Sequence, residues 1–117
     1  MNDAERMELA EARTQDDGRF AFRLLSVTLP DLDLPGGAHV RMTDIIEALV
    51  RGPSGRMSER PVATVRVGPP GDEVDAVLEP GQEAVTSRGR LRLEYALEGE
   101  EAGLPRQYYV HFTWIAG

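Results

Sequence analysis

The chain has no cysteine in its 117 residues, so disulfide bonds and thiolate metal sites are excluded. A domain of this length needs neither, because it can bury about two-thirds of its unfolded surface around one core. Lysine is also absent, and all 13 basic residues are arginines. The sequence contains no phosphate loop of the form G-x-x-x-x-G-K and no nucleophile elbow of the form G-x-S-x-G. Nucleotide and hydrolase chemistry therefore have no motif to support them.

Long apolar segments are missing as well. No apolar run approaches the roughly 20 residues of a membrane-spanning helix, so we expect a soluble chain with no membrane partner. Residues 1–6 are acidic and no apolar stretch follows them, unlike a secretory signal, so we expect the protein in the cytoplasm. The net charge of −7 repels phosphate backbones, and Arg88, Arg90 and Arg92 form only a short basic stripe. We therefore expect no nucleic-acid partner.

Period-two alternation of apolar and polar residues is the clearest signal that is present. With 41% hydrophobic and 28% charged residues, the composition is that of an ordinary globular protein, and the length suits a single domain over residues 1–117. Two alternating segments, 90–97 and 106–115, flank a turn-rich stretch and predict a hairpin. The apolar residues expected on the buried face of this hairpin are Leu91, Leu93, Tyr95, Leu97, Tyr108, Val110, Phe112 and Trp114.

Further strands are predicted upstream, bounded by strong turn signals. Residues 63–67 and 74–78 alternate on either side of a Gly-Pro-Pro-Gly-Asp turn, and Pro80-Gly81 predicts a type II turn into a short strand over residues 83–86. A hairpin turn is predicted at residues 16–18, followed by a strand from Phe20 with a β-bulge near Leu24 and Leu25. Before that turn, Met7 and Leu9 fit either a first strand or a short helix.

Residues 40–50 are ambiguous. Thr43 and Asp44 could cap a helix with Glu47 in its first turn, whereas the alternation of Val40, Met42 and Ile46 favours a strand. Long loops are predicted over residues 30–38 and 53–61. Residues 62–67 are predicted as an edge strand that could pair with another chain.

Seven or eight short strands separated by turns rich in glycine and proline indicate an all-β fold. We predict a single antiparallel β-sandwich, immunoglobulin-like or jelly-roll-like, with at most one short helix. A squat barrel is the alternative. A fold of this kind carries no function by itself.

One constellation of polar residues stands out in the predicted C-terminal hairpin. If Leu93 lies opposite Val110, then Arg92 faces His111 and Glu94 faces Tyr109. In a barrel these four residues would line the interior, where Glu94 and His111 could act as acid and base and Arg92 could hold an anion. In a sandwich they are solvent-facing cross-strand pairs.

Metal sites have weak support in the sequence. His39 and His111 are the only histidines, and nothing in their spacing brings them together with a carboxylate. Asp31 and Asp33 begin a D-x-D-x-x-G pattern, but Met42 stands where a calcium loop needs its bidentate glutamate. We expect no metal and no cofactor.

These observations favour a non-catalytic module that presents loops or a strand edge to a protein partner or to further copies of itself. A subunit of a larger particle, such as a phage component, or a small inhibitor or immunity protein would fit this description. If the chain is a phage component, we expect it on the particle. The alternative is a small barrel that binds or isomerises an apolar small molecule through Arg92, Glu94, Tyr109 and His111.

Overall fold

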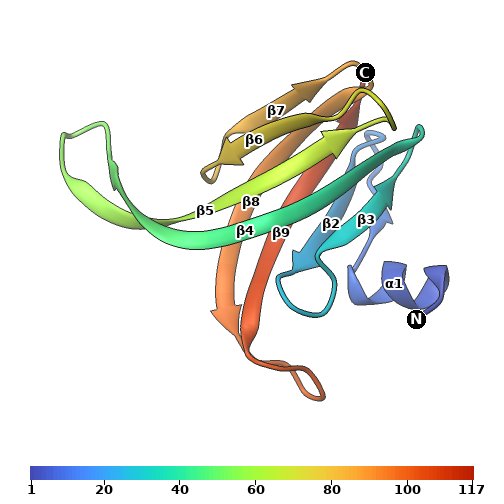
Figure 1. Ribbon diagram of the computed structural model, residues 1–117, viewed down its shortest axis with the longest axis horizontal. Helices are drawn as coiled ribbons and strands as arrows, with labels where there is room; N and C mark the ends of the chain where they lie inside the picture. The colour runs from blue at the N-terminus through green and yellow to red at the C-terminus, as the bar shows by residue number, and fades with distance from the viewer.

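Two antiparallel sheets pack face to face in the computed structural model, which describes residues 1–117 (Figure 1). The five-stranded sheet has the order β1-β2-β9-β8-β7, and the four-stranded sheet has the order β3-β4-β5-β6. The strands are β1 (Arg13–Thr14), β2 (Phe20–Leu25), β3 (Asp31–Leu34), β4 (Ala38–Arg51), β5 (Met57–Gly68), β6 (Val74–Leu78), β7 (Glu83–Thr86), β8 (Gly89–Gly99) and β9 (Gln107–Ala116). The predicted β-sandwich is confirmed, and the sheets do not close into a barrel.

The core lies between the two sheets, because the strands turn their apolar faces toward each other. β9 is the central strand of its sheet, and its Val110, Phe112 and Trp114 are almost fully buried. Phe112 stacks on Phe22 of β2, with ring centroids 5.5 Å apart. The facing sheet contributes the side chains of Val40, Met42, Ala63, Val65 and Val67. Alternation in the sequence predicted these faces correctly.

The N-terminal segment forms a helix rather than a strand. Helix α1 (Asp3–Leu9) begins at Asn2, whose side-chain oxygen accepts a hydrogen bond from the backbone N–H of Glu5 at 2.8 Å. Met7 and Leu9 of this helix pack against the edge of the core. No helix in the structure has the length and apolar character needed to cross a membrane.

Two β-bulges change which face the side chains occupy. In β4 the pairing with β5 shifts between Met42 and Asp44, and in β8 the pairing with β9 shifts between Leu93 and Tyr95. One extra residue reverses the alternation that follows it. Tyr95 and Leu97 are therefore exposed on the outer face, and their predicted place in the core is wrong.

The ambiguous segment 40–50 is strand throughout, and both predicted long loops are wrong. Residues 31–34 form β3, and residues 57–61 belong to β5, so only a short turn joins β4 and β5. The bulge predicted near Leu24 is also wrong: β2 ends at Leu25, and a turn over residues 26–28 follows. The stretch predicted as an edge lies mostly inside its sheet, because residues 63–67 pair with both β4 and β6.

The turn signals, in contrast, are confirmed. The chain reverses at residues 16–18, at residues 69–71 and at Pro80-Gly81, where Gly81 has φ 91° as a type II turn requires. The short strand predicted over residues 83–86 is β7.

Candidate functional site

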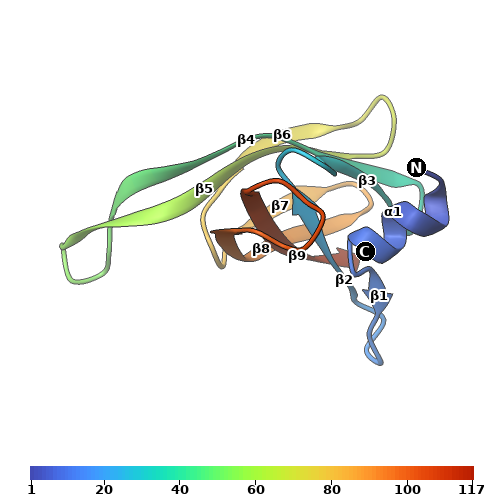
Figure 2. The same cartoon turned by 90° about the horizontal axis from the view of Figure 1, so that it is seen from below.

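The β4–β5 hairpin continues beyond the sandwich as an arm, which we define as residues 46–62. The two strands stay paired from Ile46 opposite Val62 to Arg51 opposite Met57. No residue of the arm is buried, and the buried residue of β5 nearest to the arm is Ala63. The arm points away from the body of the molecule in both views (Figures 1 and 2). It is therefore a two-stranded ribbon with no second layer over it.

The arm carries apolar side chains on both of its faces. Ile46, Ala48, Val50 and Val62 alternate along one face, and Leu49 and Met57 lie on the other. Ile46, Leu49 and Met57 are exposed by 50%, 66% and 52%. Such residues on a ribbon without a core are typical of a surface that is covered when a partner binds.

Both edges of the arm lack a neighbouring strand. β3 pairs with β4 only at Ala38–Arg41, and β6 pairs with β5 only over residues 63–67. The outward backbone N–H and C=O groups of residues 46–51 and 57–62 therefore have no strand partner. An edge of this kind is a template for strand addition by another chain.

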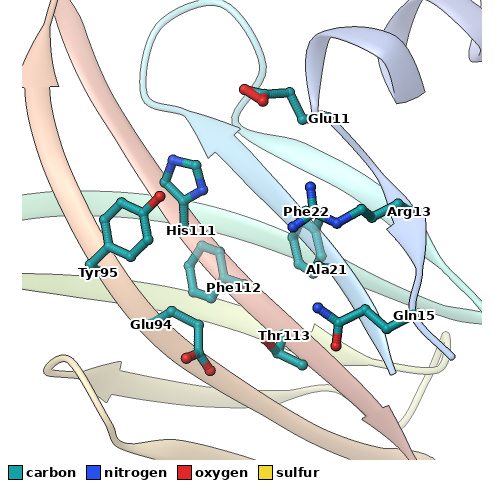
Figure 3. A pocket seen from close by; sticks show the side chains of 10 residues that line it. All are labelled: Glu11, Arg13, Gln15, Ala21, Phe22, Glu94, Tyr95, His111, Phe112 and Thr113. Carbon is teal, nitrogen blue, oxygen red and sulfur yellow. The ribbon is translucent and has the colours of Figure 1, made fainter. Parts of the chain in front are cut away.

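A second feature is a hollow on the outer face of the five-stranded sheet, which we call the His111 hollow. Its volume is about 360 Å³. Figure 3 shows side chains from β8, β9 and the N-terminal segment around its rim. His111 stacks on Tyr95, with ring centroids 4.2 Å apart. The lining residues are Glu11, Arg13, Gln15, Ala21, Phe22, Glu94, Tyr95, His111, Phe112 and Thr113.

Beside it lies a second hollow of about 390 Å³, which we call the acidic hollow. Four glutamates line it, namely Glu11, Glu98, Glu100 and Glu101. Its apolar part is formed by Tyr95 and Leu97, which the β8 bulge has turned outward. The remaining lining residues are Arg23, Gly99, Tyr109 and His111.

Arg23 is the buried charge beneath this region. Its guanidinium donates two hydrogen bonds to Glu101, at 2.6 and 3.0 Å, and one to the carbonyl of Leu9 at 3.0 Å. A further ion pair joins it to Glu11 at 2.9 Å. The hydrogen bonds to Glu101 raise the pKa of Arg23 above its ordinary value, and the same contact lowers the pKa of Glu101. This network ties β2 to the helix end and to the β8–β9 loop.

Burial also changes the pKa values of His111 and Tyr108. Burial, and then the charge of Arg23, lower the pKa of His111 below its ordinary value. Tyr109 lies under the Arg23 guanidinium, which is 5.1 Å from the ring centre, and its buried hydroxyl has no hydrogen-bond partner. Burial, followed by the charges of Glu47 and Glu98, raises the pKa of Tyr108.

The four residues predicted as a site are only partly brought together. Glu94 and His111 line the His111 hollow, Tyr109 lines the acidic hollow, and Arg92 lines neither. Arg92 pairs with Glu83 at 3.3 Å and with Glu94 at 3.6 Å. The predicted cross-strand pairs are wrong. Leu93 lies opposite Phe112, two residues further along β9 than predicted, so Arg92 faces Thr113.

The residues weighed for metal binding occupy ordinary structural positions. Asp31 and Asp33 both contact His39, at 3.2 Å and 2.7 Å. His39 is on β4 and His111 is on β9, in different sheets. No group of three or more histidine, aspartate or glutamate side chains is placed to hold a metal ion.

Comparison with family models, with curated proteins and with solved structures gives no match for this chain. Sequence reasoning missed the arm, because residues 46–62 were divided between an ambiguous segment and a supposed loop. Residues 57–62 show no apolar–polar alternation, since Glu59 shares a face with Met57 and Pro61, and Val62 shares a face with Ser58 and Arg60.

Proposed function

We propose that this chain is a non-catalytic interaction or structural module that joins a protein assembly through the arm. The observation that supports the proposal is the arm itself. It is a ribbon with apolar side chains on both faces and two unpaired edges, and nothing in its own chain covers it.

The physical reason is that an isolated two-stranded hairpin is at best marginally stable in water. The arm buries no side chain of its own, so it adds little to the core of the sandwich. A partner that paired with one edge and covered one apolar face would supply the missing layer. Strand addition combines backbone hydrogen bonds with pockets for alternate side chains, and so gives both affinity and specificity.

One side-chain hydrogen bond joins the root of the arm to the sandwich. The hydroxyl of Tyr108 donates a hydrogen bond to Glu47 at 3.4 Å. Beyond Glu47, no side-chain hydrogen bond or ion pair joins the arm to the sandwich. The body therefore holds the root while the outer part stays available to a partner.

Photo-crosslinking in the native cells tests the proposal. A photoreactive amino acid replaces Leu49 on the arm, and in a matched control it replaces Val85, which is 67% exposed on β7. We expect Leu49 to give one adduct of reproducible mass with a protein chain, identified by its peptides, and Val85 to give none. The proposal is wrong if Leu49 forms no protein adduct, or if both sites give the same adducts.

A further inference from the structure

We infer that the partner of the arm is a second copy of this chain, and that the end of the arm docks on the acidic hollow of that copy. This inference rests on the proposed function and names the partner and the surface that receives the arm. Charge, strand edges and geometry carry it independently of one another.

The end of the arm is basic in an otherwise acidic chain. Residues 51–60 contain Arg51, Arg56 and Arg60 against the single acid Glu59, while the whole chain has a net charge of −7. None of the three arginines forms an ion pair within the molecule. Arg51 donates only to the carbonyl of Gly55, across the turn. The arm therefore presents uncompensated positive charge next to the exposed side chains of Leu49 and Met57.

The acidic hollow is complementary to the end of the arm in charge and in apolar surface. Its four glutamates face two arginines, because Arg23 is held by Glu101 and Glu11, and Arg106 lies 2.9 Å from Glu98 and 3.8 Å from Glu100. A surplus of negative charge remains. Tyr95 and Leu97 supply exposed apolar surface at the same place, 47% and 60% exposed. The hydroxyl of Tyr109 beneath them has no partner.

The strand edge next to the acidic hollow is open. β7 pairs with β8 only over residues 89–92, and backbone hydrogen bonds from the preceding turn end at Leu93. Residues 95–99 of β8 therefore have no neighbour on the side away from β9. This free edge of five residues is one residue shorter than residues 57–62 of the arm, so β5 of one copy can continue the sheet of another. Arg60 and Met57 would then lie beside the glutamates and Leu97.

The end of the arm points away from the body of its own chain (Figures 1 and 2). The arm extends from the four-stranded sheet, whereas the residues that line the acidic hollow belong to the other sheet, to the β8–β9 loop and to the segment after helix α1. The turn at the end of the arm and helix α1 lie at opposite ends of the longest axis (Figure 1). The arm and the acidic hollow are different surfaces of the same chain. Each copy can therefore insert its arm into one neighbour and receive the arm of another. Contacts of this kind build rings or filaments, or a pair that exchanges arms.

Light scattering coupled to size exclusion, at a series of protein concentrations, tests the inference with three charge-reversal variants. The arm variant carries Arg56→Glu and Arg60→Glu, and the hollow variant carries Glu98→Arg and Glu100→Arg. The control carries Arg41→Glu and Arg88→Glu, two exposed arginines outside both surfaces. It changes the net charge as much as the arm variant does. Circular dichroism checks that each variant is folded.

We expect the unaltered chain and the control to form the same discrete assembly. Each of the other two variants alone should associate at least about tenfold more weakly, because like charges then meet at the contact. An equal mixture of the two should give a heterodimer, since the hollow variant keeps a basic arm and the arm variant keeps an acidic hollow. A chain that carries all four substitutions should assemble again.

Two results would overturn the inference. The first is an unaltered chain that stays monomeric at every concentration. The second is an assembly that the arm and hollow variants leave intact or that the control disrupts equally. If the chain is monomeric but Leu49 crosslinks to a different protein, the proposed function stands and only the second copy is rejected. If Leu49 crosslinks to no protein, both fail.

Discussion

Tyr95 lies flat on His111, with ring centroids 4.2 Å apart and planes 13° from parallel. The two residues face each other because the bulge at Glu94 turns Tyr95 to the outer face of its sheet. Arg23 lies opposite His111 on the other side, so the three side chains form a row across β8, β9 and β2. The row joins the two hollows and brings a titratable group next to a buried charge.

The stability of the fold should depend on the protonation of His111. Its folded-state pKa is below the ordinary 6.5, because burial and the charge of Arg23 oppose the imidazolium. As the pH falls through 6.5, the unfolded chain takes up a proton that the folded chain does not. The free energy of unfolding therefore decreases as the pH is lowered from 6.5 to the folded-state pKa of His111, and it levels off at still lower pH.

Urea unfolding across this pH range checks the expectation, with His111→Gln as the comparison. In the variant, the free energy of unfolding should lose the part of its pH dependence that His111 contributes. Glu101 does not interfere, because its pKa lies below 4.5 and its effect on stability appears only in more acidic solution. A variant that keeps the full slope would show that another group is responsible.

Arg23 should matter more to stability than the carboxylate that it contacts. Arg23→Met removes the bonds to Glu101, Glu11 and the Leu9 carbonyl, and we expect a loss of about 2–3 kcal/mol. Glu101→Gln should cost about 1 kcal/mol, because Glu101 is half exposed and Arg23 keeps Glu11. Urea unfolding of both variants measures the difference, and equal losses would contradict this account.

The stability of the fold should also depend on the side chain of Gln107. Its side-chain oxygen accepts hydrogen bonds from the backbone N–H groups of Val27 and Thr28, both at 2.9 Å, and its amide nitrogen donates to the Thr28 hydroxyl. Gln107→Ala leaves these groups without their partner, and we expect a loss of about 2 kcal/mol. Thr28→Val removes only the last bond and should cost less than half as much by the same measurement. A neutral Gln107→Ala variant would mean that water replaces the side chain.

Local signals in the sequence were enough to predict the sandwich. Turns such as Pro80-Gly81 depend on the backbone preferences of a few neighbouring residues, and the faces of β9 follow from alternation alone. The bulges could not be predicted, because an extra residue is defined only by its pairing with the neighbouring strand, and the sequence of one strand does not show this pairing. This is why Tyr95 was assigned to the core, whereas the register opposite Arg92 was wrong because the turn is centred nearer to β9 than predicted, between Gly99 and Gln107.

The arm escaped prediction for a related reason. Alternation indicates a strand when one face is apolar and the other polar, but residues 46–62 have apolar side chains on both faces. Sequence rules assume that a strand is buried on at least one side. A strand that projects without a core breaks this assumption, and such departures are expected at functional sites.

Removing the arm should leave the sandwich almost as stable as before. In this variant residues 46–62 are replaced by an Asn-Gly turn between Ile45 and Ala63, which face each other across the strand pair. The arm contributes no buried side chain, so we expect the free energy of unfolding to change by less than about 1 kcal/mol. Urea unfolding of the two proteins, compared under conditions where both are monomeric, gives this difference. A loss as large as that from Arg23→Met would mean that the arm is part of the folding unit. A small change means that the arm is dispensable for the fold, which is what a segment retained for binding requires.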